Sequence, residues 1–141
     1  ASRAQLVEEV IQPALKSGKV VICDRFADST IAYQGWGRGL DLKMVKALNN
    51  TATRGLKPGL TILLDIPFEA GIARKSNRKH DRFEQEALAF HKMVRAGYIK
   101  MARDEPERWL VIDASQSKEK IKEIIWLGVS RLLQAQHDAG Q

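Results

Sequence analysis

The sequence has 141 residues, a length that suits one domain, and its content of 44% hydrophobic and 28% charged residues excludes an intrinsically disordered chain. No run approaches the roughly 18 consecutive apolar residues that cross a bilayer, and the one cysteine, Cys23, excludes a disulfide framework and is typical of a reducing cytoplasm. The net charge of +6 indicates an anionic partner without specifying its kind.

The first elements along the chain are predicted to be a helix and a buried strand. Apolar residues recur at helical spacing from Ala4 to Lys16, and Gly18 is a natural helix stop. The run that follows, Lys19–Cys23, is short, apolar and rich in β-branched residues, which is typical of a strand buried on both faces. We therefore expect Cys23 to be a small core residue.

Two more helices are predicted before the middle of the chain. One covers residues 28–33, with Asp28 or Ser29 available as its N-cap. The second begins after the cap residue Asp41 and extends to about Thr53. Between the two helices the chain is expected to be broken by Gly35, Gly37 and Gly39.

Strands and helices alternate in the second half of the chain. Apolar strands are predicted at 60–66 and 109–112. One helix is predicted to start at Pro67, and two others cover 84–103 and 119–137. This alternation predicts an α/β fold with a parallel sheet that is covered by helices on both faces.

An aspartate stands at the end of each predicted strand: Asp24, Asp65 and Asp113. Ligands of open parallel sheets bind at the carboxyl ends of the strands, so these residues are candidates for a polar site. The alternative is that Asp65 and Asp113 only cap the turns that follow them. Asp24 differs because Arg25 adjoins it: a carboxylate can bind Mg²⁺ and a guanidinium can bind phosphate, although a surface ion pair is the plainer interpretation.

The segment 74–82, RKSNRKHDR, is the most basic part of the chain, with five fixed positive charges and one negative charge. One interpretation is a solvated face of a helix. The other is a basic flap that closes over phosphates, where an arginine stabilises the charge that develops during phosphoryl transfer. Near the Asp24 segment, Tyr33, Gln34 and Trp36 could contact a nucleobase or could be core and turn residues.

Several motifs occur in an order that resembles the thymidylate kinase family. Residues 24–35, DRFADSTIAYQG, resemble the substrate signature of that family. Leu64–Asp65, the run PFEAG at 67–71, the run DRFEQE at 81–86 and Ile112–Ala114 follow in the same order as in the family. The resemblance spans essentially the whole chain. It implies the architecture of a P-loop nucleoside monophosphate kinase and the ATP-dependent phosphorylation of dTMP to dTDP in cytoplasmic dTTP biosynthesis.

The resemblance also implies roles for the substrate signature. Asp24 is expected to be catalytic, to hold Mg²⁺ and to orient the acceptor phosphate, and Arg25 is expected to bind the phosphate of dTMP. Thr30 and Gln34 are expected at the thymine edge, and Tyr33 against the deoxyribose. The implied substrate-binding residues are Arg25, Ser29, Thr30, Tyr33 and Gln34.

Two other segments are implied to bind ATP. A lid of about residues 74–83 would carry the catalytic arginines Arg74 and Arg78, with Arg78 as the charge stabiliser. The loop after the third predicted strand would border the adenine. The implied ATP-binding residues are Arg74, Arg78, Arg82, Asp113, Ala114 and Gln116.

The family's first strand and its phosphate-binding loop, G-x-x-x-x-G-K-[ST], have no counterpart in the printed sequence. We therefore expect residues 1–141 to form a single domain that is the C-terminal portion of a longer enzyme, and to lack kinase activity without that loop. The resemblance further implies a homodimer through helices that include residues 4–16, with no nucleic-acid or membrane partner. The alternative, suggested by the basic charge, is a non-catalytic nucleic-acid-binding domain.

Overall fold

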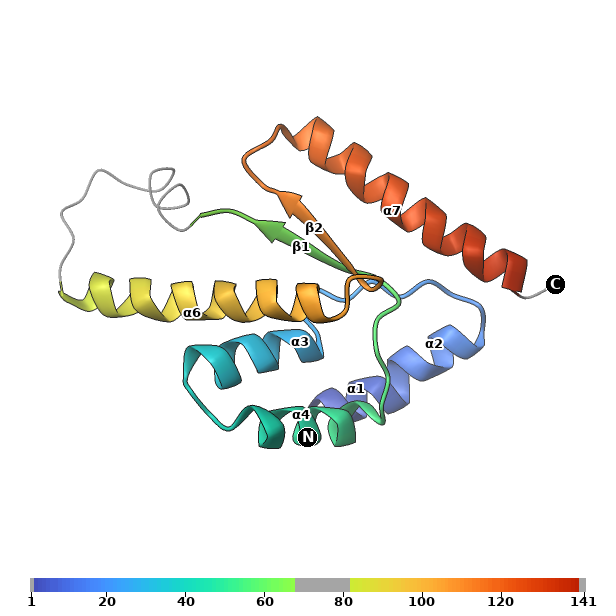
Figure 1. Ribbon diagram of the computed structural model, residues 1–141. Helices are drawn as coiled ribbons and strands as arrows, with labels where there is room; N and C mark the ends of the chain where they lie inside the picture. Colours follow the sequence, from blue (N-terminus) through green and yellow to red (C-terminus); the bar gives the residue numbers. More distant parts are fainter. Residues whose placement is uncertain (1, 68–81, 140–141) are drawn as a thin grey trace. The chain divides into compact units, whose positions relative to one another are not determined.

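The computed structural model describes residues 2–67 and 82–139 of the chain (Figure 1). The chain forms two compact units, Ala1–Lys57 and Pro58–Gln141. The prediction of a single domain stays a prediction. No helix in the described ranges is long and apolar enough to cross a bilayer.

The N-terminal unit begins with one continuous helical segment. It consists of α1 (Ser2–Leu6), the π-helical turn η1 (Val7–Ile11) and α2 (Gln12–Lys16). Val7 and Ile11 are buried and lie four residues apart, as the apolar spacing predicts. Pro13, which lacks a backbone N–H, lies just after the π-helical turn, where the regular i→i−4 hydrogen bonds are already interrupted. The predicted helix at residues 4–16 is therefore confirmed, with a π-helical middle that periodicity did not indicate.

The predicted strand at residues 19–23 is wrong. The segment has no regular secondary structure, and Val20 and Ile22 are 62% and 93% exposed. A strand is stabilised by hydrogen bonds to a neighbouring strand, and no strand of the described part of the chain pairs with this segment. For the same reason Cys23 is exposed, which corrects its assignment to the core.

The helices that follow differ in part from their predicted bounds. Helix α3 (Ala27–Thr30) continues directly into the π-helical η2 (Ile31–Gly37). Phe26 is the N-cap residue and makes no side-chain cap, so neither Asp28 nor Ser29 has that role. Helical structure continues through the first two glycines, because Gly35 packs against the side chain of Leu42 where a Cβ atom would collide.

The helix α4 (Leu42–Thr53) starts as predicted. The carboxylate of Asp41 accepts a hydrogen bond of 2.6 Å from the backbone N–H of Met44, which is the arrangement of an N-cap. The buried face of α4 consists of Val45, Asn49 and Thr53. Within this unit α4 contacts both α1 and α3.

The C-terminal unit is a small α/β structure. Its strands, β1 (Thr61–Asp65) and β2 (Trp109–Asp113), are parallel and in register from Thr61–Trp109 to Asp65–Asp113. Both strands were predicted, as were the helices α6 (Arg82–Asp104) and α7 (Lys118–Ala139).

The two helices cover opposite faces of this sheet (Figure 1). Successive residues of a strand point to opposite faces. Trp109 packs edge-on against Tyr98 of α6, with ring centroids 6.3 Å apart, whereas Leu110 lies against Gly128 of α7. The predicted parallel sheet with helices on both faces is thus confirmed for the described strands.

The cap of α4 gives a test of the N-terminal unit. Asp41→Ala removes the acceptor for the Met44 N–H, and we expect the free energy of unfolding to fall by about 1 kcal/mol. Urea denaturation of the two proteins measures the difference. Asp41→Asn is the control, since an asparagine oxygen can still accept the bond. Equal stability of the alanine variant and the original protein would contradict the cap.

Candidate functional site

The predicted Asp24-Arg25 motif lies in the loop that precedes α3. Arg25 has a backbone φ of +63°, in the left-handed region that a non-glycine residue adopts at a cost. Its guanidinium carbon lies 4.4 Å from the centroid of the Tyr33 ring, close enough for a cation–π interaction. Tyr33 lies on η2, so this contact brings together two of the predicted substrate-binding residues.

The hydroxyl of Thr30 takes part in a network that the sequence did not reveal. Arg3 donates one hydrogen bond of 2.8 Å from Nη2 to Thr30 Oγ1 and another of 2.8 Å from Nη1 to Asn49 Oδ1. The Asn49 amide in turn donates a bond of 2.8 Å to the carbonyl of Ala27, at the start of α3. The guanidinium of Arg3 also lies 6.0 Å from the ring centroid of Phe26.

Arg3 is therefore a candidate site residue that sequence analysis missed. One signal could have found it. Arg3 lies four residues before Val7 and eight before Ile11, both of them buried, so it continues the apolar stripe of the first helix. A charged residue on such a stripe must reach a polar partner.

The other predicted residues of this unit have different surroundings. Ser29 is buried, with 9% of its surface exposed, and Gln34 is partly exposed on η2. Asp24 is exposed, and no cationic side chain among the described residues pairs with it. The plainer interpretation was a surface ion pair between Asp24 and Arg25. This pair is not formed, because the Arg25 guanidinium lies over the ring of Tyr33.

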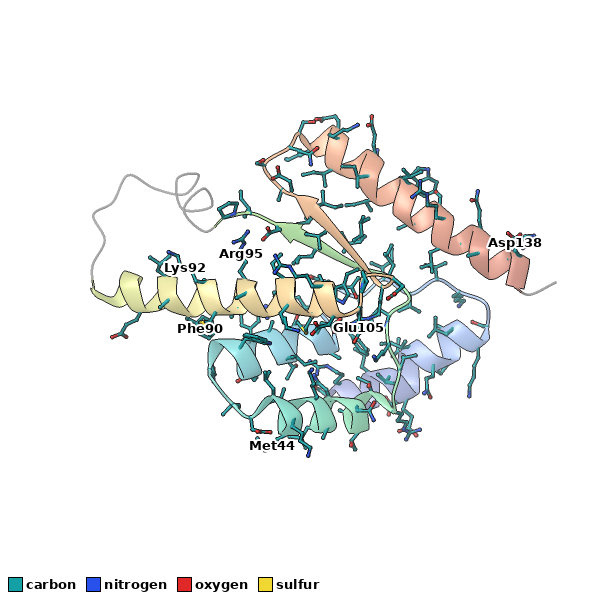
Figure 2. All side chains as sticks on the ribbon, in the orientation of Figure 1. Met44, Phe90, Lys92, Arg95, Glu105 and Asp138 are labelled. Atoms are coloured by element: carbon teal, nitrogen blue, oxygen red, sulfur yellow. The ribbon has the colours of Figure 1, made fainter. Side chains whose placement is uncertain are left out.

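The C-terminal unit places Asp65 and Asp113 side by side at the carboxyl ends of β1 and β2. The N–H of Ala114 donates a hydrogen bond of 2.8 Å to the carbonyl of Asp65, which continues the pairing beyond the strands. The carboxylate of Asp65 accepts two bonds from Arg95, 2.6 Å from Nε and 2.7 Å from Nη2. Figure 2 shows Arg95 directed from α6 toward the strand. Arg95 was not among the predicted residues, since its partner is 30 positions away.

Asp113 caps the turn that follows its strand. Its carboxylate accepts a bond of 2.8 Å from the Ser115 N–H. Hydrogen bonds from the Ser115 side chain, and then from its backbone, hold the pKa of Asp113 below the ordinary value. The side-chain amide of Gln116 donates a hydrogen bond of 3.2 Å to the backbone carbonyl of Asp113. The turn-cap interpretation therefore describes Asp113, and its place beside adenine stays a prediction.

The basic segment 74–82 lies almost entirely outside the residues that the structure describes. Arg74 and Arg78 lie outside the described residues, and Arg82 is the first residue of α6. The helix predicted to start at Pro67 also falls mainly on residues outside the described ranges.

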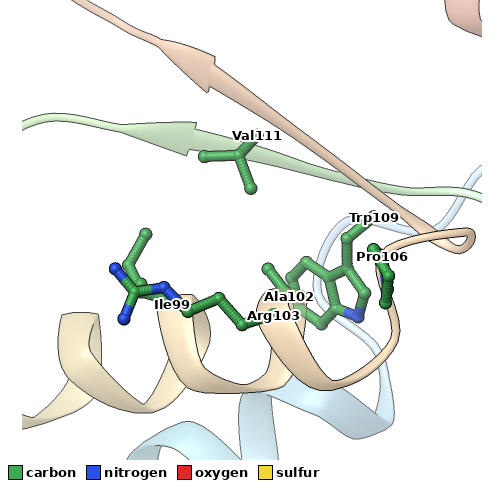
Figure 3. Close-up of a pocket in the computed structure, with 6 residues that line it drawn as sticks. All are labelled: Ile99, Ala102, Arg103, Pro106, Trp109 and Val111. Carbon is green, nitrogen blue, oxygen red and sulfur yellow. The ribbon is translucent and has the colours of Figure 1, made fainter.

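A hollow lies on the α6 side of β2 (Figure 3). Its volume is about 580 Å³, and none of the predicted site residues that the structure describes lines it. The described lining residues are Ile99, Ala102, Arg103, Pro106, Trp109 and Val111. They include no carboxylate, thiol or hydroxyl group. The described residues of the lining therefore offer no acid, base or nucleophile for chemistry.

Comparison with known proteins establishes the family. A family model described as thymidylate kinase matches residues 1–125. The chain belongs to the thymidylate kinase family. It is 51% identical over 136 residues to a thymidylate kinase of Geotalea uraniireducens, with 92% of this chain and 64% of that protein aligned. It is 49% identical over 131 residues to one of Deinococcus radiodurans, with the same two coverages of 92% and 64%.

A solved structure agrees with this membership. The crystal structure of thymidylate kinase from Ehrlichia chaffeensis matches with a TM-score of 0.60 and 33% identity, over 78% of this chain and 51% of that chain. The chain thus spans less than two thirds of the length of each of these three thymidylate kinases. The resemblance stated from the motifs and the α/β fold class are confirmed, and the nucleic-acid-binding alternative is not favoured.

The paired carboxylate and guanidinium of Asp65 and Arg95 give a second test. A double-mutant cycle with Asp65→Asn and Arg95→Gln should yield a coupling energy of about 1 kcal/mol, kept small because Arg95 is 45% exposed. The same cycle on Lys120 and Glu123, 3.4 Å apart and 59% and 70% exposed, is the control and should give about 0.3 kcal/mol or less. Equal coupling energies in the two pairs would show that the bidentate contact stabilises the protein no more than an ordinary exposed ion pair, which would contradict the prediction.

The pKa of Asp113 gives a third test. Ser115→Ala removes the side-chain hydrogen bond that is the main cause of the lowered pKa, so the carboxyl of Asp113 should titrate at a higher pH. In the original protein, the stability that the Asp113 carboxylate contributes is present above its unfolded-state pKa and is lost as the pH falls through its folded-state pKa. Because the folded-state pKa is higher in the variant, the variant should lose this contribution at a higher pH. NMR titration of the carboxyl carbon measures the shift. Ser117→Ala, which removes the acceptor for the Lys120 N–H, is the control and should leave the Asp113 pKa unchanged. An unshifted Asp113 pKa in Ser115→Ala would contradict the role of the Ser115 hydrogen bond.

Proposed function

We propose that the protein, in its full length, transfers the γ-phosphoryl group of ATP to dTMP and forms dTDP. Membership of the thymidylate kinase family is the observation that carries this proposal. The geometry of the substrate signature supports it, because Arg25, Thr30 and Tyr33 lie on one short stretch of loop and helix and are held by specific contacts.

Arg25 is proposed to bind the phosphate of dTMP. Its guanidinium rests on the face of Tyr33 and makes no hydrogen bond with another described residue, so its five N–H donors remain for phosphate oxygens. Because the left-handed backbone and the aromatic ring hold the side chain before a ligand arrives, little conformational entropy is lost on binding.

Asp24 is proposed to help hold Mg²⁺, which would neutralise charge on the transferring phosphoryl group. Mg²⁺ in kinases is bound by one or two carboxylates together with substrate phosphates and water. An exposed carboxylate without a cationic partner among the described residues fits that requirement. The same carboxylate is proposed to orient the acceptor phosphate.

The base and sugar of dTMP are proposed to lie along α3 and η2. Thr30 and Gln34 would meet the thymine edge, Tyr33 would pack against the deoxyribose, and Ser29 would complete the set. Arg3 joins this group because its guanidinium is bonded to Thr30 and to a neutral amide, which leaves its full positive charge for an acceptor on the ligand.

The donor nucleotide is proposed to contact the residues implied by the resemblance. Arg74, Arg78 and Arg82 would bind the phosphates of ATP, and the loop of Asp113, Ala114 and Gln116 would border the adenine. Hydrogen bonds within that loop fix its conformation, and a fixed loop can pack against the flat adenine ring.

The protein is further proposed to act in the cytoplasm as a homodimer through helices that include residues 4–16. Leu6 and Val10 support this proposal. They are 41% and 55% exposed and lie four residues apart, so they form an apolar stripe on the outside of the first helix.

A kinetic experiment tests the proposed function. The full-length protein with ATP, Mg²⁺ and dTMP should produce ADP and dTDP. Arg78→Ala should lower kcat by roughly 10³-fold, because an arginine at the transferring group acts in the transition state, while the KM for dTMP stays nearly unchanged.

Arg131→Ala is the matched control, since Arg131 is an exposed arginine on α7 outside the proposed site. Its kcat should equal that of the original protein. Absence of ADP formation in the original protein would overturn the proposed function. An equal loss of kcat and of dTMP affinity in Arg78→Ala would contradict only the role of Arg78.

A further inference from the structure

Asn49 is a buried amide on α4, with 6% of its surface exposed. Burial of an amide costs free energy unless its donor and its acceptor are both satisfied. Both are satisfied here: Nδ2 donates to the carbonyl of Ala27, and Oδ1 accepts from Arg3, each at 2.8 Å. These partners are 22 and 46 positions away along the chain, so Asn49 joins three separate segments of the N-terminal unit.

The amide is the group that this position requires. Arg3 can only donate hydrogen bonds and the Ala27 carbonyl can only accept them, so the side chain between them must offer one acceptor and one donor. Aspartate would offer acceptors only, and an apolar residue would leave both partners unsatisfied. Asn50, the next residue, is exposed and makes neither contact.

The network also sets the direction of the Thr30 hydroxyl. A hydroxyl has one proton to donate and can accept two hydrogen bonds. Because Thr30 Oγ1 already accepts from Arg3, its own proton remains to be donated to another acceptor. A ring carbonyl oxygen of a pyrimidine is an acceptor of that kind.

We propose that Asn49 is a positioning residue for the nucleotide site. It holds the guanidinium of Arg3 and the start of α3, and through Arg3 it orients the hydroxyl of Thr30 toward the pyrimidine base. Asn49 itself does not touch the substrate. The proposal rests on the proposed function, because it takes the base to lie beside Thr30.

Steady-state kinetics of the full-length protein test the proposal. Asn49→Ala should raise the KM for dTMP about tenfold, which corresponds to the loss of one hydrogen bond to a charged group. The kcat and the KM for ATP should change less than about twofold, because the contact acts on the bound base and not on the transition state. Asn50→Ala is the matched control and should leave all these values unchanged.

A double-mutant cycle shows whether the effect passes through Arg3. If it does, Asn49→Ala should raise the KM for dTMP only slightly further in a protein that already carries Arg3→Ala. Asn49→Asp keeps an acceptor for Arg3 and most of the side-chain volume but loses the donor to the Ala27 carbonyl. It should therefore restore only the part of the dTMP affinity that depends on Arg3. The aspartate variant also decides the question if Asn49→Ala is too unstable to assay.

Three results would overturn the proposal. One is a lowered Tm with an unchanged KM for dTMP, which indicates a purely structural role. Another is additive effects of the substitutions at Arg3 and Asn49, and the third is an aspartate variant as impaired as the alanine variant. If the unaltered protein does not phosphorylate dTMP, the proposed function fails and this proposal fails with it, a result distinct from those three.

Discussion

Burial of a polar group costs free energy unless the group finds a hydrogen-bond partner inside the protein, and this constraint positions the candidate site residues of the N-terminal unit. In the N-terminal unit it joins the buried amide of Asn49 to Arg3 and to the first turn of α3. In the C-terminal unit the Asp65 carboxylate, which is 19% exposed, forms a bidentate contact with the more exposed Arg95. Each contact spans more than 20 positions of the chain, so the sites depend on long-range polar pairs that hold otherwise ordinary helices and strands.

The contacts of two exposed candidates separate a residue that remains available to a ligand from one that does not. Arg25 rests on an aromatic face, and a ring face satisfies charge without occupying N–H donors. Asp113 is instead engaged by its own turn, which lowers its pKa and uses part of its accepting capacity. A guanidinium that keeps its N–H donors unoccupied suits phosphate binding. A carboxylate that is bonded within its own turn instead keeps that turn rigid.

Much of the fold was predictable because the relevant forces act over a few residues. Helical periodicity indicated residues 4–16, the cap at Asp41 marked the start of α4, and both strands of the sheet were found from their apolar runs. The strand predicted at 19–23 was wrong, because a strand also requires a partner that periodicity does not show. Gly35 did not break its helix, because its lack of a side chain serves close packing against Leu42.

The sequence by itself determined the α/β class, most of the element bounds and, through the order of its motifs, the thymidylate kinase family. It also named Arg25, Thr30 and Tyr33 as candidates. Only the tertiary structure decided which groups pair with them, and it added Arg3, Asn49 and Arg95. The physical reason is one of range: propensity, periodicity and capping are properties of neighbours in the chain, whereas hydrogen-bond partners are chosen after folding has brought distant segments together.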